Sequence, residues 1–292
     1  MQVLEQMLKR YKINSVEEKK HAIKEIIQEI VLSGLSRANF FKDAAFYGGT
    51  ALRIFYNLDR FSEDLDFSLL ISNPDYDFDH YISFVKNEVE SLGLKFEVDE
   101  KKKVKQTQIK SAFLKGNTRE QFLVFYPDQN HDVAILHADE KIKVKFEIDT
   151  DPPKYANTEI KYRLLPYPYQ VRIYDLPSLF AGKIDAVLCR NWGKRLKGRD
   201  FYDYVYFLSM EIGVNIKHLK YRLVQSGYID SDFELTNESL VHLLNQRFDE
   251  IDFEEAKKDV APFITNLNKL DLWSKEFFKE ITKNIRVSWM YE

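Results

Sequence analysis

The spacing of apolar residues near the start of the chain predicts an amphipathic helix. Ser15 followed by Glu18 has the pattern of a capping box, which marks a helix start. Gly34 marks the predicted end, since glycine commonly stops a helix. The apolar residues between them recur at intervals of three and four, the period of one buried helix face. They are Ile23, Ile26, Ile27, Ile30 and Val31.

From about residue 44 to 165 the pattern changes to short segments in which apolar and polar residues alternate. This period of two is typical of strands with one buried face. Residues 44–47 form a short apolar strand, and residues 78–92 have helical spacing. We predict an α+β region with a sheet of about five strands. The segments of that sheet are 64–70, 94–98, 107–114, 122–126 and 141–148.

After Asp151-Pro152-Pro153, which must break regular structure, and a passage rich in Pro and Tyr at 166–169, the chain becomes helical. We predict an α+β domain over residues 1–168, including the N-terminal helices, and an all-α domain over 169–292. Such a join commonly contains a binding cleft. The predicted helices are 179–189, 199–210, 216–225, 238–248, 254–260 and 272–285.

Composition narrows the class of protein. The 292 residues are 45% hydrophobic and 30% charged, with a net charge of −3, as in a globular protein without a strong bias toward anionic partners. A single cysteine, Cys189, excludes an intramolecular disulfide and a cysteine-based zinc site, and its apolar flanks indicate a buried, inert thiol. No signal peptide and no run of 18 apolar residues is found, so we expect a cytoplasmic protein without a membrane span.

Two glycines precede a short predicted helix at the end of the 44–47 strand. Gly48 and Gly49 permit a ligand to approach the backbone closely, and Thr50 is a candidate helix cap. The free N–H groups at a helix start suit a phosphate. An isolated Gly-Gly-Thr is more commonly an ordinary turn.

Three acidic residues are candidates for a metal site. In a strand, Asp64 and Asp66 point to one face, where two like charges need a cation or a base to neutralise them. Glu147 occupies the exposed face of the predicted 141–148 strand, and Asp149 is the competing choice on the same face. We favour Glu147, because Asp149 stands next to the Thr-Asp-Pro-Pro break. Three such carboxylates suit two Mg²⁺ or Mn²⁺ ions that hold substrate phosphates. The alternative is that these acidic residues lie on a solvent-exposed strand face and bind no metal.

The order of these motifs resembles that of a known family. Gly48-Gly49-Thr50, a short helix and then Arg60-Phe-Ser62-Glu63-Asp64-Leu65-Asp66-Phe are similar to the signature of the AbiEii/AbiGii-type nucleotidyltransferase toxins, within the polymerase-beta-like superfamily. Downstream, Leu179-Phe-Ala-Gly-Lys183 and Lys197-Gly-Arg199-Asp200-Phe-Tyr-Asp203 are similar to the later lysine and R-D-x-x-D motifs of that family. The resemblance covers roughly residues 45–208.

This resemblance implies a nucleotidyltransferase-like fold and transfer of a nucleotide from an NTP, with a divalent metal, onto an acceptor hydroxyl. In characterised members the acceptor can be the 3′ end of tRNA, and a neighbouring antitoxin is expected. Glu147 stands where many relatives carry Asp, which is a departure from the pattern. The implied metal ligands are Asp64, Asp66 and Glu147. The implied nucleotide-binding residues are Gly48, Gly49, Thr50, Ser62, Lys183 and Arg199, with Asp200 as the essential acid of the helical half.

Ordinary explanations exist for the downstream residues. Lys183 on an apolar helix is commonly a solvated side chain, and the acids Asp200 and Asp203 at a helix start also favour the helix dipole. Two basic runs are either solvated segments or contacts to an NTP or an RNA backbone. They are Lys194, Arg195, Lys197 and Arg199, and Lys101, Lys102, Lys103, Lys105 and Lys110.

The leading hypothesis is therefore a metal-dependent nucleotidyltransferase toxin. Two alternatives remain at this point. A D-x-D glycosyltransferase also holds a nucleotide diphosphate through a metal, although the spacing from Gly-Gly-Thr to Asp64 fits it poorly. A non-catalytic protein would keep the nucleotide pocket without turnover.

Overall fold

The computed structural model describes residues 2–99, 118–127, 141–190 and 196–288. Its internal contacts divide the chain into two compact units. Unit 1 comprises residues 1–56, 61–152 and 158–173. Unit 2 comprises residues 57–60, 153–157 and 174–292. Two short segments, 57–60 and 153–157, thus interrupt unit 1 in sequence but pack within unit 2.

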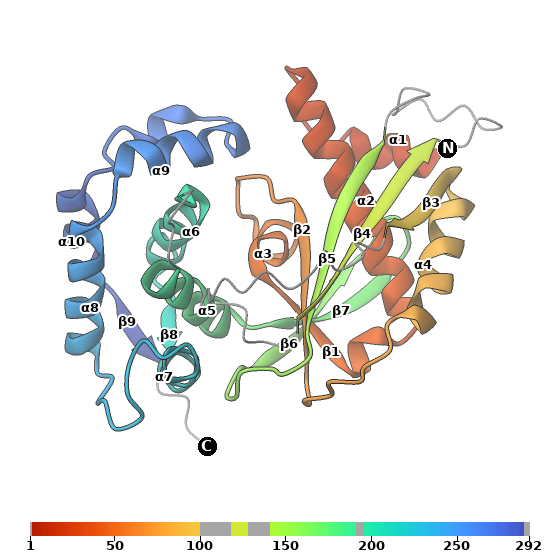
Figure 1. The fold of residues 1–292 in the computed structure, drawn as a ribbon. Coiled ribbons are helices and arrows are strands. Elements are labelled where there is room, and N and C mark those ends of the chain that lie inside the picture. Colours follow the sequence, from red (N-terminus) through yellow and green to blue (C-terminus); the bar gives the residue numbers. More distant parts are fainter. Residues whose placement is uncertain (1, 100–117, 128–140, 191–195, 289–292) are drawn as a thin grey trace. The chain divides into compact units, whose positions relative to one another are not determined.

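A seven-stranded mixed sheet forms the centre of unit 1, with the strand order β3-β4-β5-β2-β1-β7-β6 (Figure 1). β2 lies in the middle, antiparallel to β1 on one side and parallel to β5 on the other. The strands are β1 (Ala44–Tyr47), β2 (Asp64–Leu69), β3 (Leu94–Asp99), β4 (Thr118–Pro127), β5 (Ile142–Asp149), β6 (Thr158–Arg163) and β7 (Tyr169–Tyr174).

One face of this sheet carries an aromatic core. Phe67 of β2 stacks on Phe146 of β5 with ring centroids 4.7 Å apart, and Phe40 packs edge-on against Phe67. All three side chains are fully buried. Because side chains alternate along a strand, the residues between these aromatics lie on the opposite face, where β2 and β5 carry charge.

The helices of unit 1 correct one prediction. The N-terminal helix begins as expected, with the Ser15 hydroxyl accepting the N–H of Glu18, but it continues past Gly34 to Arg37. Gly34 instead allows α2 to approach α4 closely, since a Cβ at residue 34 would lie 3.0 Å from the Cα of Val85 on α4.

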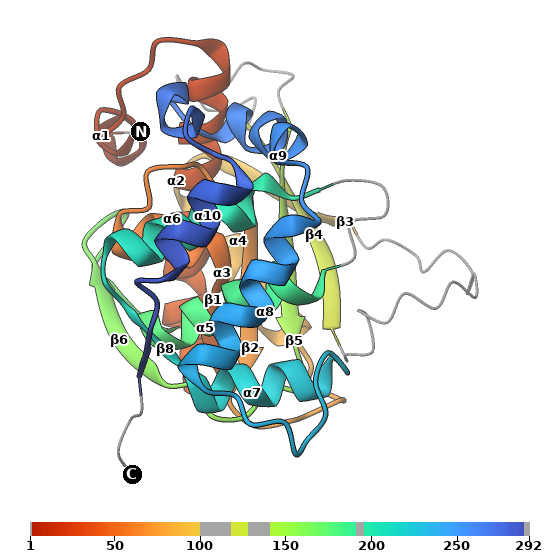
Figure 2. The same ribbon diagram turned by 90° about the vertical axis from the view of Figure 1, so that its left-hand side faces the viewer.

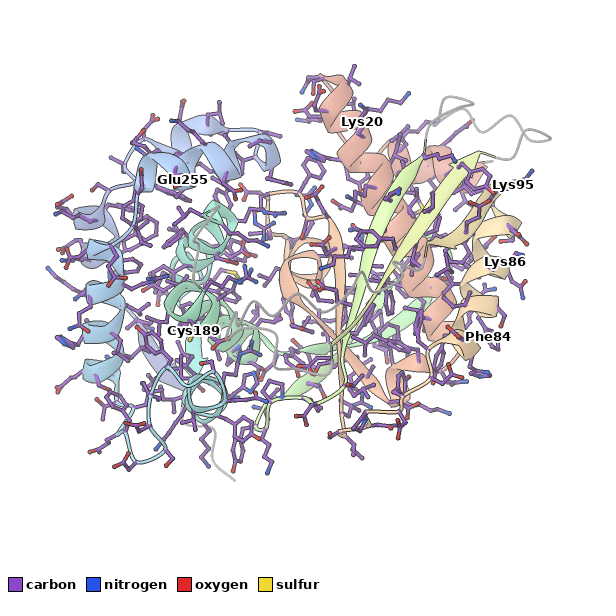
Figure 3. The ribbon with its side chains drawn as sticks, viewed as in Figure 1. Lys20, Phe84, Lys86, Lys95, Cys189 and Glu255 are labelled. Carbon is purple, nitrogen blue, oxygen red and sulfur yellow. The ribbon has the colours of Figure 1, made fainter. Side chains whose placement is uncertain are left out.

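The opposite side of α4 is exposed, and it carries Phe84 and Lys86 (Figure 3). The helices are α1 (Gln2–Leu8), α2 (Val16–Arg37), η1 (Phe40–Lys42), α3 (Gly48–Tyr56) and α4 (Asp79–Ser91).

Unit 2 is helical apart from one short parallel strand pair. Phe201, Phe248 and Phe278 bring together α6, α8 and α10 in a buried aromatic core, and α8 and α10 run side by side (Figure 2). No helix among the described residues has the length and apolar character needed to cross a membrane. The elements are α5 (Leu176–Cys189), α6 (Gly198–Ser209), β8 (Gly213–Asn215), α7 (Ile216–Gln225), α8 (Asn237–Asp249), α9 (Phe253–Val260), η2 (Ala261–Phe263), η3 (Leu267–Leu270), α10 (Lys275–Thr282) and β9 (Arg286–Ser288).

The α+β fold class is confirmed: a mixed sheet with flanking helices precedes a helical half. Three details differ. β6 and β7 were not predicted, and β8 and β9 add strands to the helical half. The predicted helix 272–285 is wrong in extent, because the Ser274 hydroxyl caps α10 by accepting the N–H of Phe277. The predicted strand 107–114 lies outside the described residues.

Candidate active site

Asp64 and Asp66 lie on the charged face of β2. The intervening Leu65 and the following Phe67 are fully buried on the core face, whereas both aspartates are partly exposed. The strand period that separates core from solvent therefore also places the two carboxylates side by side on one face. β2 is an inner strand of the sheet, so a rigid ladder on both sides holds this pair.

The register of β5 brings a third carboxylate to the same face. Glu147 is paired with Asp66 on the adjacent parallel strand, while Asp149 is paired with Ser68, two residues further along. The carboxylate of Asp149 accepts the backbone N–H of Asp151 at 3.0 Å, as a turn residue does. The register thus favours Glu147 over Asp149 as the neighbour of Asp66.

A lysine accompanies these acids. Lys145 is paired in register with Asp64, and its Nζ lies 2.6 Å from Oε1 of Glu147. The alternation of β5 places Lys145 and Glu147 on the same face. The carboxylate face of the sheet therefore includes Lys145 within ion-pair distance of Glu147.

Gly48 lies directly against the carboxylate of Asp66. Its φ of +82° is in the left-handed region that favours glycine. A Cβ at this position would lie 2.2 Å from Oδ2 of Asp66, which no side chain tolerates. The glycine turn thus brings the start of α3 into contact with the carboxylate face, and any side chain at residue 48 would displace Asp66.

The neighbouring predicted residues have structural partners. Thr50 is not a helix cap, because α3 already begins at Gly48. The Thr50 side chain is fully buried, and its hydroxyl donates to the backbone carbonyl of Asp64 at 2.5 Å. The carbonyl of Ser62 accepts from the side-chain amide of Gln28 at 3.3 Å. Both contacts tie the segment that leads into β2 to the helices of unit 1.

The donor set on this face is suited to a hard cation. Mg²⁺ and Mn²⁺ prefer carboxylate oxygens, and Asp64 and Asp66 offer these from a partly exposed strand face. Across the described residues, no group of three or more acidic, His or Cys side chains has the arrangement of a metal site. Oε1 of Glu147 is engaged by Lys145, so a cation that binds this oxygen would compete with the ion pair.

Unit 2 contains a network of five charged residues, of which Arg60, Asp200 and Asp203 are buried and Arg190 is 41% exposed. Lys183 of α5 lies 3.0 Å from Asp200 and 2.7 Å from Asp203, both on α6. Arg60 donates from Nε and Nη2 to the two carboxylate oxygens of Asp203, each at 2.6 Å. Arg190 completes the network at 2.5 Å from Asp200. Three cations and two carboxylates leave one net positive charge.

Burial and charge act in opposite directions in this network. Burial acts to raise the pKa of Asp200, but the positive charges of Arg190 and Lys183 outweigh it and hold the pKa well below its ordinary value. Burial likewise acts to lower the pKa of Arg60, but the charge and hydrogen bonds of Asp203 raise it overall. Asp200 and Arg60 are therefore both charged at neutral pH.

The remaining predicted residues lie in different surroundings. Arg199 stands over the ring of Phe263, with its Cζ 4.3 Å from the ring centroid. Cys189 on α5 is buried, and burial raises the pKa of its thiol to about 12, which agrees with an inert residue (Figure 3). The basic residues Lys194, Arg195, Lys101, Lys102, Lys103, Lys105 and Lys110 lie outside the described residues.

Three charged residues near the predicted sites had no role assigned from the sequence. Lys145 alternates with the apolar residues of β5, so the period of two could have placed it on the carboxylate face. Arg60 stands four positions before Asp64 and was visible only as part of a motif. Arg190 follows the end of α5 and carries no local signal. Its partner Asp200 is brought to it by the packing of α6.

Comparison with known proteins identifies a matching family and solved structures of similar fold. The profile of a family described as "Nucleotidyl transferase AbiEii toxin, Type IV TA system" matches residues 30–280. No curated protein matches. Among solved structures, JHP933 from Helicobacter pylori has a TM-score of 0.52 at 18% identity, covering 91% of this chain and 93% of that one. MenT4, a nucleotidyltransferase toxin from Mycobacterium tuberculosis, has a TM-score of 0.51 at 15% identity, covering 98% of both chains. At such identities these two structures show a shared fold.

Proposed function

Because this chain belongs to the AbiEii family of nucleotidyltransferase toxins, we propose that the charged face of β2 and β5 is its reaction site. The chain is a nucleotidyltransferase, and its family implies an NTP substrate and a cognate antitoxin. The observation that carries the proposal is the register of Asp66 with Glu147, beside Asp64 and against Gly48. The family gives no support to the D-x-D glycosyltransferase alternative.

We assign each group on this face a part in the transfer. An acceptor hydroxyl forms a bond to the α-phosphorus of the NTP while the bond to the leaving pyrophosphate breaks. The hydroxyl proton passes to a carboxylate oxygen of this face. The backbone at Gly48 and Gly49, where α3 begins, accommodates the phosphates. A divalent cation bound by Asp64 and Asp66, and by Glu147 once it is released from Lys145, would neutralise phosphate charge and favour ionisation of the hydroxyl.

We assign the charged network of unit 2 to the nucleotide. Asp200 and Asp203 hold the ammonium of Lys183 in one position, and Arg60 in turn fixes Asp203. A lysine held in this way supplies a positioned point charge for the triphosphate. Ser62 and Arg199 remain candidate nucleotide contacts. We further propose the 3′ end of tRNA as the acceptor and Mg²⁺ or Mn²⁺ as the cation.

The experiment is transfer of α-labelled phosphate from each NTP onto total RNA, in Mg²⁺ and in Mn²⁺. Loss of an electrostatic contribution of several kcal/mol predicts that Asp64→Asn lowers transfer about a hundredfold or more. Asp75→Asn, on an exposed residue of unit 1, is the matched control and should transfer as wild type does. Retention of full transfer by Asp64→Asn would reject the carboxylate face as the site. Labelled products of a size other than tRNA would reject only the proposed acceptor.

A further inference from the structure

Lys145 is a cation on the strand face that carries Asp64, Asp66 and Glu147. Its backbone is paired with Asp64, and its ammonium is 2.6 Å from Glu147, which itself is paired with Asp66. About a quarter of the Lys145 side chain is exposed, and the Glu147 side chain is exposed to 22%. The ion pair is therefore within reach of solvent and of an entering ion.

The charge of Lys145 counteracts a repulsion that the strand pattern creates. Asp64, Asp66 and Glu147 share one face of adjacent strands, and like charges at such spacing disfavour one another. The ammonium of Lys145 lies beside Glu147 and offsets part of this repulsion. Lysine suits the task, because its flexible four-carbon stem lets a compact charge move while the backbone stays in the sheet.

We propose that Lys145 is a built-in counter-ion that holds Glu147 in the metal-free protein and is displaced from it by the divalent cation. This inference rests on the proposed function of the carboxylate face. Lys145 acts through Glu147 and is a positioning residue. A partly exposed ion pair is weak, so a divalent cation with two aspartates already in place can compete for the glutamate.

The proposal predicts the direction of an effect on metal affinity. Lys145 occupies one oxygen of the proposed ligand Glu147, and its positive charge also repels the cation, so both effects weaken metal binding in the absence of nucleotide. Replacing it with methionine, which keeps an unbranched apolar stem of similar length, removes both. Lys145→Met should therefore bind Mn²⁺ roughly threefold to tenfold more tightly than wild type, as expected for loss of one partly screened charge.

The test is a titration of chelator-treated, nucleotide-free protein with Mn²⁺, with free Mn²⁺ measured by electron paramagnetic resonance. Lys143→Met is the matched control, since Lys143 lies two residues away on the same strand face and the substitution changes the net charge equally. Its affinity for Mn²⁺ should stay within about twofold of wild type. The same comparison in a Glu147→Gln background separates the ligand from the charge, because the gain from Lys145→Met should shrink there. Thermal unfolding of each variant confirms that it is folded.

The outcomes separate this inference from the proposed function. If wild type binds Mn²⁺ and Lys145→Met binds it no more tightly, the counter-ion role is wrong while the carboxylate site stands. An equal gain in Lys143→Met, or an undiminished gain in the Glu147→Gln background, also overturns the role of the ion pair. If wild type binds no Mn²⁺ and Asp64→Asn still transfers nucleotide, both proposals are wrong.

Discussion

Arg60 offers the sharpest test of how the charged network stabilises unit 2. It is exposed to only 2%, and its Nε and Nη2 both donate to the carboxylate of Asp203, which is fully buried. Arg60→Met retains much of the side-chain volume but leaves Asp203 with Lys183 as its one remaining cation among the described residues. Removing one partner of a buried ion pair costs about 3–5 kcal/mol. Because Lys183 stays 2.7 Å from Asp203, we expect a loss at the lower end, about 3 kcal/mol.

Urea unfolding followed by tryptophan fluorescence measures this loss. Trp273 is buried in unit 2, the unit that also contains Arg60, so its fluorescence reports on unit 2. With a denaturant dependence of about 2 kcal/mol per molar urea, a loss of 3 kcal/mol lowers the midpoint by about 1.5 M. Arg286→Met is the control: Arg286 pairs with Glu211 on the surface, both side chains being about two-thirds exposed, and should leave the midpoint unchanged.

A double-mutant cycle with Asp203→Asn isolates the pair itself. Asp203→Asn alone leaves Arg60 and Lys183 facing a neutral amide, whereas the double variant removes Arg60 together with that charge. We expect the loss of unfolding free energy in the double variant to be about 2 kcal/mol smaller than the sum of the losses in the two single variants. If Arg60→Met unfolds within about 1 kcal/mol of wild type, the network does not hold unit 2 together and the reasoning fails.

Two further predictions concern backbone conformation and proton uptake. Gly48→Ala should abolish transfer and destabilise unit 1, because the new Cβ would lie 2.2 Å from Oδ2 of Asp66. Gly227→Ala is the control: its φ is +72°, and a Cβ there has no atom within 4 Å, so it should cost only the backbone strain of about 1–2 kcal/mol. Burial, aided by the charge of Arg222, lowers the pKa of His218 from 6.5 to about 4, so the unfolded chain binds a proton in this range and the folded protein does not. The unfolding free energy of unit 2 should therefore fall by up to about 3 kcal/mol between pH 6.5 and 4, and less steeply in His218→Gln. Equal slopes in both proteins would exclude His218 as the cause.

Local patterns sufficed for much of the secondary structure. Residues 216–225 form a helix with the predicted bounds, and residues 44–47 form the predicted strand. In these segments the apolar period, the flanking polar residues and the tertiary packing all favour the same conformation. Where they differ, packing decides. The N-terminal helix continues through Gly34, because that residue lies against the backbone of Val85 on α4.

The two missed strands of unit 1 show the limit of periodicity. β6 is an edge strand whose Ile160 and Tyr162 are exposed, while Glu159 binds the hydroxyl of Tyr56. Because the apolar side chains of β6 lie in solvent while Glu159 contacts Tyr56, the alternation does not identify a buried apolar face. β7 begins directly after the passage rich in Pro and Tyr, which predicted a loop. Its strand conformation depends on pairing with β1, more than 120 residues earlier in the sequence.

What the sequence determined by itself is the part of the site built from short-range geometry. A period of two places Asp64 and Asp66 together, and Glu147 with Lys145, because strand alternation needs no knowledge of the rest of the chain. Only the tertiary structure decided which strands are neighbours. The pairing of β2 with β5 is what places Glu147 next to Asp66. The same holds for Arg60 and Asp203, which are 143 residues apart and meet because a buried charge must find a partner of opposite sign.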